Sequence, residues 1–423
     1  MPARFLRFLK TLGPGFVAGA SDDDPSGIAT YAQAGAAFGL ATLWTALITF
    51  PLMWAIQYTC ATIAMVTGRG LTSVIRVHYP RWLLYGLVAA LTLANTINAG
   101  VDIGAISAAV RLLIPGFPQI PLLLAITAAL LALQVWGSYR LIARVFRWLA
   151  FVLLAYIGAA LFSHPDWGAV LHATVLPHLQ FNGEYLTILV AILGTTITPY
   201  LFFWQASQEV EEEVAKGRHT IEQRQGTTAA ELADARWDVG SGMFFSNVVM
   251  YFIILASAAA LFGNGSRHHE VNSAADLALA LRPLAGDLAY GLFAVGLIGA
   301  GFLCVPILTT SAAFAVAESL HDRTGLSSKP RDAKLFYGVI VGTTLAGLAL
   351  NFLPINPIRA LVWTAVINGL LAPPMLLLVM LIATNREIMG RHATAPVRNT
   401  IGWITTVVMT VAALALVASW IRP

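Results

Sequence analysis

Apolar residues occur along this chain in long runs, separated by short segments that carry most of the charged residues. Each run has about 20 residues or more, the length that an α-helix needs to cross a hydrocarbon core of roughly 30 Å. Eleven such runs are present, at residues 12–31, 38–66, 82–110, 120–138, 145–163, 185–207, 240–262, 287–317, 335–353, 357–383 and 400–420. The pattern predicts an all-α polytopic membrane protein with 11 transmembrane helices, in a single transmembrane domain over residues 1–423.

The overall composition agrees with a chain embedded in lipid. Hydrophobic residues make up 58% of the 423 residues, charged residues make up only 11%, and the mean hydropathy is +0.74. These values lie far outside the range of ordinary soluble domains. The lipid bilayer is therefore an expected partner of the chain, whereas the sequence does not indicate an oligomeric state.

The 25 basic residues are distributed unequally between the two sets of loops. Twenty lie at the N-terminus or in loops that follow even-numbered runs, and the other side has only Arg111, Arg267, Arg282, Arg359 and Arg422. The net charge of +4 therefore follows the topology and does not indicate a nucleic-acid partner. By the positive-inside rule, we expect a multi-pass protein of the inner (plasma) membrane, with the N-terminus in the cytoplasm and the C-terminus outside.

Acidic residues are rare inside the runs, and three of them are consecutive. Asp22, Asp23 and Asp24 lie in the first run, and Asp102 lies in the third. A charged side chain in the hydrocarbon layer costs at least about 2.5–3.5 kcal/mol, and adjacent carboxylates also repel one another. We therefore expect a cation or a water-filled cavity beside the three consecutive aspartates.

Two of the runs carry the signs of a broken helix. In the first, Asp24 precedes Pro25, and proline lacks the backbone donor that a continuous helix needs. In the sixth, residues 195–200 read Thr-Thr-Ile-Thr-Pro-Tyr. Paired interruptions at corresponding places are typical of inverted-repeat transporters, whose binding site lies near the middle of the membrane. We place the two repeats at about residues 12–163 and 185–383, with an extra helix at 400–420.

The chain resembles, nearly from end to end, the Nramp family of divalent metal transporters, and more closely its Nramp-related magnesium transporter branch. The resemblance rests on Gly13-Pro14-Gly15-Phe16, on Asp24-Pro25-Ser26-Gly27 where typical members have Asp-Pro-Gly-Asn, on Gln33-Ala34-Gly35, on Phe38-Gly39 and on Ile56-Gln57-Tyr58. It implies a LeuT-type fold, a 5+5 inverted repeat plus one helix, with spans 1 and 6 broken. No cofactor is expected, since the metal ion is the substrate.

The sixth run departs from the family pattern in a way that bears on the ion. Typical members read Ala-x-x-Met-Pro-His, whereas this chain has Thr195, Thr198, Pro199 and Tyr200 at those places. Soft sulfur favours soft or borderline metals, so a hydroxyl in its place, and Gly27 in place of an asparagine, leave an all-oxygen site suited to Mg²⁺ or Mn²⁺. The predicted metal ligands are Asp24, Gly27, Thr195 and Thr198, with Ser21, Asp23 and Asn368 as weaker candidates.

Other residues inside the runs have less definite roles. Asn95, Asn98, Asp102 and Asn247 either line the ion path or form interhelical hydrogen bonds. Cys60 and Cys304 lack the spacing of a metal or redox motif, and we expect them to be small buried residues.

The predicted function is a secondary transporter that carries Mg²⁺ and/or Mn²⁺ inward. All nine histidines fall in loops or at the ends of runs, whereas proton-coupled carriers usually have titratable residues within their spans. Two charges that move through an inward-negative potential release about 4.6 kcal/mol per 100 mV, enough for roughly a thousandfold accumulation. We therefore expect the membrane potential to drive transport without obligatory proton coupling.

Three alternatives compete with this interpretation. A proton-coupled Mn²⁺/Fe²⁺ importer of the standard Nramp type is the nearest, and Thr198 argues against it. A sodium-coupled amino-acid symporter on the same fold would bring a substrate carboxylate close to the acidic triplet, which would repel it. A membrane-embedded enzyme would need a nucleophile with its base, a haem ligand or an intramembrane zinc motif, and we find none in the sequence.

Overall fold

The computed structural model describes residues 13–136, 155–262, 273–279, 286, 289–326, 328–393 and 395–421, and all the regular secondary structure in these residues is helical. The long helices are α4 (Trp44–Thr67), α6 (Arg81–Leu113), α7 (Gln119–Trp136), α14 (Ala229–Ser257), α17 (Ala289–Ser319), α18 (Lys334–Leu350), α19 (Pro357–Thr384) and α21 (Pro396–Ile421). Four shorter helices form two consecutive pairs, α2 (Pro14–Asp22) with α3 (Pro25–Phe38), and α11 (Gly183–Thr196) with α12 (Pro199–Ala215). The remaining helices are η1 (Gly39–Thr42), α5 (Leu71–His78), α9 (Ala155–Phe162), α10 (Trp167–Val175), α13 (Ile221–Arg224), η2 (Ala258–Phe262), α15 (Ala274–Leu279), α20 (Arg386–Met389) and η4 (Gly390–Ala393).

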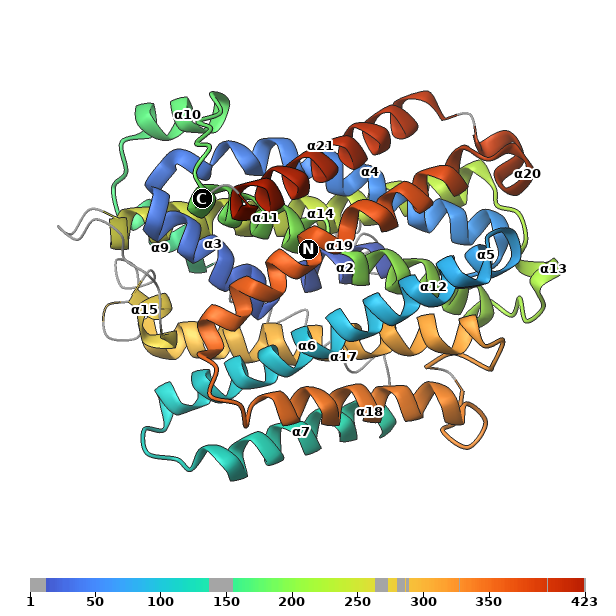
Figure 1. Cartoon of the computed structure of the whole chain (residues 1–423), viewed down its shortest axis with the longest axis horizontal. Helices are drawn as coiled ribbons and strands as arrows, with labels where there is room; N and C mark the ends of the chain where they lie inside the picture. The colour runs from blue at the N-terminus through green and yellow to red at the C-terminus, as the bar shows by residue number, and fades with distance from the viewer. Residues whose placement is uncertain are drawn as a thin grey trace, which may run out of the picture.

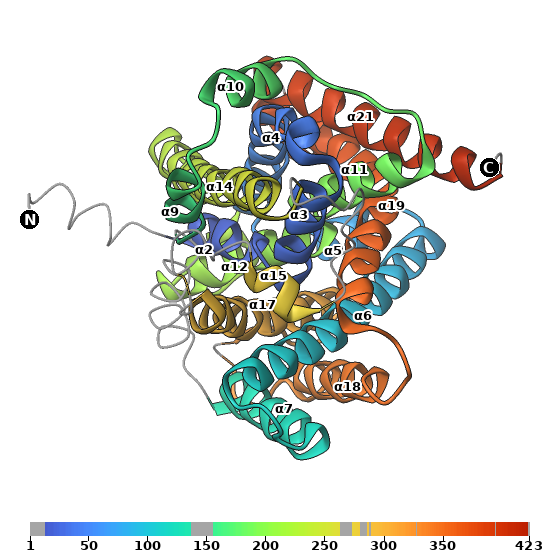
Figure 2. The ribbon, with the colours of Figure 1, turned by 90° about the vertical axis from the view of Figure 1, so that its left-hand side faces the viewer.

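The long helices run roughly along the longest axis of the molecule (Figure 1). The paired helices α2, α3, α11 and α12 lie in the interior, where they contact α14, α17 and α19. Helices α7 and α18 form one edge of the molecule, and α10 and α21 form the opposite edge (Figure 2). The short helices α5, α13 and α20 lie at one end, and α10 and α15 lie at the other. This separation agrees with the assignment of their segments to opposite sides of the membrane, while the orientation of the chain stays a prediction.

The observed helices agree with most of the predicted runs. Eight helical segments in the described part of the chain are long and apolar enough to cross a membrane, with α11 and α12 counted together. The first run is divided into α2 and α3, the ninth is the 17-residue α18, and the fifth lies partly outside the described residues. The breaks predicted in the first and sixth runs are present, whereas the total of 11 transmembrane helices stays a prediction.

One face of α21 has the composition of a surface in contact with lipid. Ile404, Val407, Val411 and Leu414 are 49–64% exposed and recur every three or four residues, so they form one stripe along the helix. The opposite face is buried against α4 and α19 and carries small and polar residues such as Gly402 and Thr406. A helix that exposes its apolar face and buries its polar one is stable only if that face meets lipid.

Helix α2 packs against α14 with almost no space between the two backbones. A methyl group added at Gly19 would collide with the backbone of Gly242, and one added at Gly15 would lie 2.5 Å from the backbone nitrogen of Val239. Small residues at such positions allow membrane helices to approach closely, which maximises van der Waals contact in a medium without a hydrophobic driving force. The sequence Gly15-x-x-x-Gly19 thus fixes α2 on α14.

The N-terminus of α2 is held by a side chain of the same partner helix. Asp238 of α14 accepts hydrogen bonds from the backbone nitrogens of Gly13 at 2.7 Å, Gly15 at 2.7 Å and Phe16 at 3.3 Å. No side chain of the local segment caps this helix, so Asp238 provides the acceptors that the first turn otherwise lacks. Its negative charge also interacts favourably with the helix dipole.

We predict that Asp238→Ala lowers the midpoint of thermal unfolding of the purified protein, because loss of a helix cap destabilises a protein by about 1–2 kcal/mol. Asp234→Ala, an exposed position one turn earlier on α14, is the matched control and should leave the midpoint unchanged. Equal midpoints for the two variants in detergent would contradict a stabilising role for the cap.

Candidate metal site

Two helix breaks form the centre of the molecule, and each has the same local cause. Helix α2 ends at Asp22 and α3 begins at Pro25, with Asp24 as its extended N-cap residue at φ −70° and ψ 170°. Helix α11 ends at Thr196 and α12 begins at Pro199, with Thr198 as its N-cap residue at φ −95° and ψ 133°. A proline at the first helical position restricts the preceding residue to extended conformations, so each helix must restart there.

The two breaks face each other in an antiparallel arrangement. Before the first break, the Ser21 carbonyl accepts a hydrogen bond from the hydroxyl of Tyr200, which follows the second break, at 3.1 Å. After the first break, Gly27 lies against Thr195, which precedes the second; a methyl group on Gly27 would lie 3.0 Å from Thr195 Oγ1. Because contacts on both sides of the breaks pair in this crossed order, the residues between them lie opposite one another.

Helix ends give this region a distinctive electrostatic character. Helices α2 and α11 end here, and the last carbonyl groups of a helix have no partner within it. These carbonyls carry partial negative charge, which favours a cation. Helices α3 and α12 begin here with the opposite partial charge, and the carboxylate of Asp24 offsets it for α3. The arrangement therefore presents oxygen atoms and one carboxylate to a common centre.

Asp24 is the most connected side chain at the breaks. Its Oδ1 accepts hydrogen bonds from the Ser26 hydroxyl and from the Gly27 backbone nitrogen, each at 2.6 Å. Its Oδ2 accepts from Asn98 of α6 at 3.2 Å and makes a longer contact, 3.8 Å, with the thiol of Cys304 in α17. The side chain is 1% exposed, so donors from three helices fix the carboxylate in a closed interior.

Asp22 and Asp23 face α14 and share one hydrogen-bond donor. Ser246 Oγ lies 2.8 Å from Asp22 Oδ2 and 3.3 Å from Asp23 Oδ1, and its single hydrogen can serve only one of them at a time. The other oxygen of each aspartate has no hydrogen-bond partner among the described residues, although both side chains are at most 1% exposed. The triplet is therefore buried with more acceptors than donors.

The other predicted ligands occupy different positions relative to the breaks. Thr198 is 1% exposed and its Oγ1 has no hydrogen-bond partner in the described part of the chain, so its lone pairs are available. Thr195 lies beside Gly27, as stated above. The Ser21 hydroxyl instead donates to its own helix, at Val17 O or Ala18 O, both at 2.9 Å, and only its carbonyl faces the second break.

Asn368 forms no hydrogen bond with the three consecutive aspartates within the described residues. It is buried in α19, next to Gly369, where α19 packs against Gly194 and Val190 of α11. Within the described residues, no hydrogen bond joins its amide to Asp22, Asp23 or Asp24. Metal ligation by Asn368, like that by the other predicted residues, stays a prediction.

The polar residues of α6 and α14 divide into two groups. Asn98 donates to Asp24 Oδ2 and belongs to the site. Asn95 donates to the Leu308 carbonyl at 3.0 Å, and Asn247 donates to the Ala46 carbonyl at 2.5 Å, so both connect helices instead. All three asparagines therefore form interhelical hydrogen bonds, one of the two roles that the sequence left open, and a place on the ion path stays a prediction.

Cys304 lies beside Asp24 and Asp102, a position that the sequence did not indicate for this cysteine, whereas Asp102 was among the residues expected to line the ion path or to form interhelical hydrogen bonds. The closest ligand atoms of Asp24, Asp102 and Cys304 all lie within 4.8 Å of one another, and all three residues are buried. Both cysteines are buried, as expected, and Cys304 also contacts Asp24 at the first break. No local spacing reveals this, since α6 and α17 meet only in the folded chain. The expectation of an all-oxygen ligand set stays a prediction, and the thiol of Cys304 lies 3.8 Å from Asp24 Oδ2.

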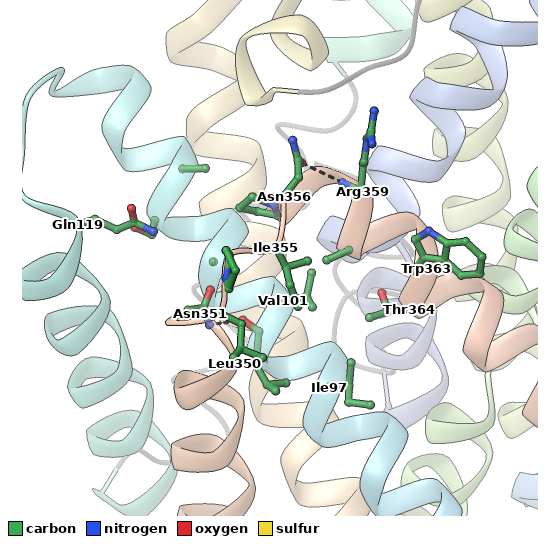
Figure 3. Close-up of a pocket in the computed structure, with 18 of the residues that line it drawn as sticks. Ile97, Val101, Gln119, Leu350, Asn351, Ile355, Asn356, Arg359, Trp363 and Thr364 are labelled. Atoms are coloured by element: carbon green, nitrogen blue, oxygen red, sulfur yellow. Dashed lines mark hydrogen bonds between the residues drawn. The ribbon is translucent and has the colours of Figure 1, made fainter.

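A cavity of about 1080 Å³ lies on the other side of α6 (Figure 3). Its walls come from α6, α19, the segment before α19 and the start of α7, and they include Val101, Gly104, Arg111, Arg359 and Thr364. None of the four buried aspartates lines it. It is therefore distinct from the space between the breaks, which is closed in this structure.

Comparisons by sequence place this geometry in a known family. The chain matches the family described as natural resistance-associated macrophage protein-like (Nramp) over residues 15–419. The divalent metal cation transporter MntH of Klebsiella pneumoniae is 28% identical over 403 residues, which cover 93% of this chain and 90% of the relative. MntH of Pectobacterium carotovorum is 30% identical over 295 residues, which cover 69% of this chain and 68% of the relative.

Solved structures show a similar fold. A manganese transporter of Eremococcus coleocola, crystallised with an aromatic bis-isothiourea substituted compound, has a TM-score of 0.76 at 17% identity, covering 99% of this chain and 88% of its own. The inward-facing conformation of Mhp1 has a TM-score of 0.52 at 12% identity, covering 96% of this chain and 90% of its own. At these identities the likeness concerns the fold alone. The family match, which extends over nearly the whole chain, is more specific: this chain belongs to the Nramp family.

Proposed function

We propose that this chain carries divalent metal ions inward across the cytoplasmic membrane, with Mg²⁺ or Mn²⁺ as substrate and the membrane potential as driving force. The observation that carries the proposal is the Asp24 carboxylate at a helix break, opposite a second break whose Thr198 hydroxyl has no partner among the described residues. The proposed ligands are Asp24, the backbone near Gly27, Thr195 and Thr198, with Ser21 acting through its carbonyl. Asp23 and Asn368 are proposed as weaker ligands.

The charge of the site supports a cation as substrate. Three consecutive buried aspartates, with unpaired oxygens on two of them, lie at this break. An amino acid would bring its own carboxylate to the same place, where the like charges would repel each other. The family consists of metal transporters and not of enzymes, and the MntH relatives are described as divalent metal cation transporters, so the ion is substrate and no cofactor is needed.

The choice of ion follows from the donor atoms on the two breaks. Carboxylate, hydroxyl and carbonyl oxygens are the ligands that Mg²⁺ and Mn²⁺ prefer, whereas thioether sulfur favours softer metals. Thr198 supplies a hydroxyl where the resemblance leads one to expect methionine. Mg²⁺ also retains part of its hydration shell, which suits a site with few side-chain ligands.

The absence of histidine from the described spans supports uncoupled transport. Seven of the nine histidines are described, and none lies in a helix that is long and apolar enough to span the membrane. His268 and His269 lie outside the described residues. The electrical work on two charges, about 4.6 kcal/mol per 100 mV, is sufficient to concentrate the ion without protons.

The first prediction from this proposal concerns Asp24. Asp24→Asn keeps an acceptor for the Gly27 nitrogen but removes the charge, so we expect Mg²⁺ uptake into proteoliposomes under an inside-negative potential to fall to the level of protein-free vesicles. A Mg²⁺-sensitive dye inside the vesicles reports uptake, and Asp332→Ala, an exposed position before α18, is the control. Undiminished uptake by Asp24→Asn would exclude this ion path.

A second prediction tests the hydroxyl of Thr198. Thr198→Val preserves the shape of the side chain and removes its oxygen, so the Mg²⁺ concentration at half-maximal uptake should rise roughly tenfold, equivalent to about 1.4 kcal/mol. Thr196→Val is the matched control, because the Thr196 hydroxyl is equally buried but donates to Ile192 O of its own helix at 2.9 Å. Identical concentration dependence in the two variants would remove Thr198 from the ligand set.

A third prediction concerns protons. In vesicles that hold a pH-sensitive dye, metal uptake driven by the potential should produce no matching acidification, and it should persist without a pH gradient. Proton entry that tracks metal entry, with Mn²⁺ taken up only under an inward proton gradient and no Mg²⁺ influx, would instead identify a proton-coupled Mn²⁺/Fe²⁺ importer of the standard Nramp type.

A further inference from the structure

A second group of potential metal ligands adjoins the helix breaks. It consists of Asp24 from the first break, Asp102 from α6 and Cys304 from α17, whose closest ligand atoms lie within 4.8 Å of one another. Their exposed fractions are 1%, 0% and 0%. Asp102 and Cys304 belong to neither break, and the ligand set proposed above does not use them.

Asp102 has a buried carboxylate with no hydrogen-bond partner among the described residues. Both of its carboxylate oxygens are buried, and neither has a hydrogen-bond partner among the described residues. A buried carboxylate without hydrogen bonds is costly unless a cation compensates it. The ion pairs of Lys216 and Arg218 with Glu213 and Glu231 lie at the ends of α12 and α14, far along the sequence from Asp102.

Cys304 is placed so that its sulfur faces the two carboxylates. Its Sγ lies 3.8 Å from Asp24 Oδ2 and 3.4 Å from the Tyr200 hydroxyl, which in turn reaches the Ser21 carbonyl. Bond lengths of about 2.3 Å to sulfur and 2.0–2.2 Å to oxygen place a sulfur and an oxygen ligand of one tetrahedral ion about 3.7 Å apart. The distance of 3.8 Å from Cys304 Sγ to Asp24 Oδ2 is close to this value, and the other separations in the group are at most 4.8 Å. Small rotations of the three side chains therefore suffice to enclose an ion.

We infer that Asp24, Asp102 and Cys304 form a second coordination position, which binds borderline and soft divalent ions such as Co²⁺, Zn²⁺ or Cd²⁺ through one sulfur and two carboxylates. A thiolate beside two carboxylates favours these ions over Mg²⁺. Binding displaces the thiol proton to water, since a coordinating cysteine is deprotonated. The inference rests on the proposed transport path only because the two positions share Asp24.

This second position changes the ion class that the site admits. The second break offers a hydroxyl at Thr198, so any soft donor for the transported ion must come from elsewhere, and Cys304 on α17 is the sulfur in contact with Asp24. An ion that moves from the oxygen ligands of the breaks toward α17 would exchange hydroxyl and carbonyl ligands for a thiolate. Soft ions would then be retained longer than Mg²⁺ and would compete with it.

Co²⁺ absorption spectroscopy of the purified full-length protein tests the inference. A thiolate bound to Co²⁺ produces a charge-transfer band in the near ultraviolet, which oxygen ligands do not produce. The chain has only two cysteines, and Cys60, buried in α4, is not a member of the group formed by Asp24, Asp102 and Cys304. We expect the band in the native protein and in Cys60→Ser, and its loss in Cys304→Ser. Calorimetric titration with Cd²⁺ should show affinity reduced at least roughly tenfold in Cys304→Ser and in Asp102→Asn.

Several outcomes would overturn the inference. No thiolate band in Cys60→Ser, where Cys304 is the remaining thiol, would show that Cys304 does not bind metal, and this holds even if Cys304→Ser fails to fold. An unchanged Cd²⁺ affinity in Asp102→Asn would remove the second carboxylate. A thiolate band in a protein that shows no metal uptake in proteoliposomes would refute the proposed function and leave the inference intact. Metal uptake without a thiolate band would refute the inference and leave the proposed function intact.

Discussion

The Asp24 carboxylate satisfies two demands at once, and the rest of the interior is arranged around it. It caps the N-terminus of α3 after the break, and it places a negative charge in an apolar helix bundle, where charge is otherwise rare. Burying that charge requires donors, which Ser26, Asn98 and Cys304 supply from three different helices. The prolines produce the two breaks, and the donors to Asp24 bring α3, α6 and α17 together beside them.

Much of this arrangement was accessible from the sequence because its causes are local. A proline after Asp24 and another after Thr198 each remove a backbone donor and favour an extended preceding residue, and both predicted breaks are present within a residue or two. Long apolar runs likewise determine where most helices lie. The total number of spans is less accessible, since α18 has 17 residues and part of the fifth run lies outside the described residues.

The residues that contact the aspartates from distant parts of the same chain could not be identified from the sequence. Cys304 is separated from Asp24 by 280 positions, and Ser246 is separated from Asp22 by 224. Each is an ordinary small residue in an apolar helix, and only the packing of α14 and α17 gives it a role. The sequence therefore identifies where charge must be compensated, while the identity of the compensating atoms depends on tertiary structure.

The manganese transporter shares the fold, and in the proposed function it is the donor atoms at the breaks that determine which ion is favoured. The hydroxyl of Thr198 precedes α12 and the thiol of Cys304 lies on α17, so the proposed hard and soft donors come from different helices. A change of ion preference could arise at either donor without a change of fold.

The contact between Gly19 and Gly242 has a mechanical consequence for any transporter of this design. Because the two backbones touch and Asp238 holds the start of α2, neither helix can rotate or slide alone without a collision or the loss of three hydrogen bonds. Helices α2 and α14 therefore form one rigid unit. Ser246, which contacts Asp22 and Asp23, lies on the same helix as Asp238, so a movement of α2 and α14 as a unit would carry the aspartates with it.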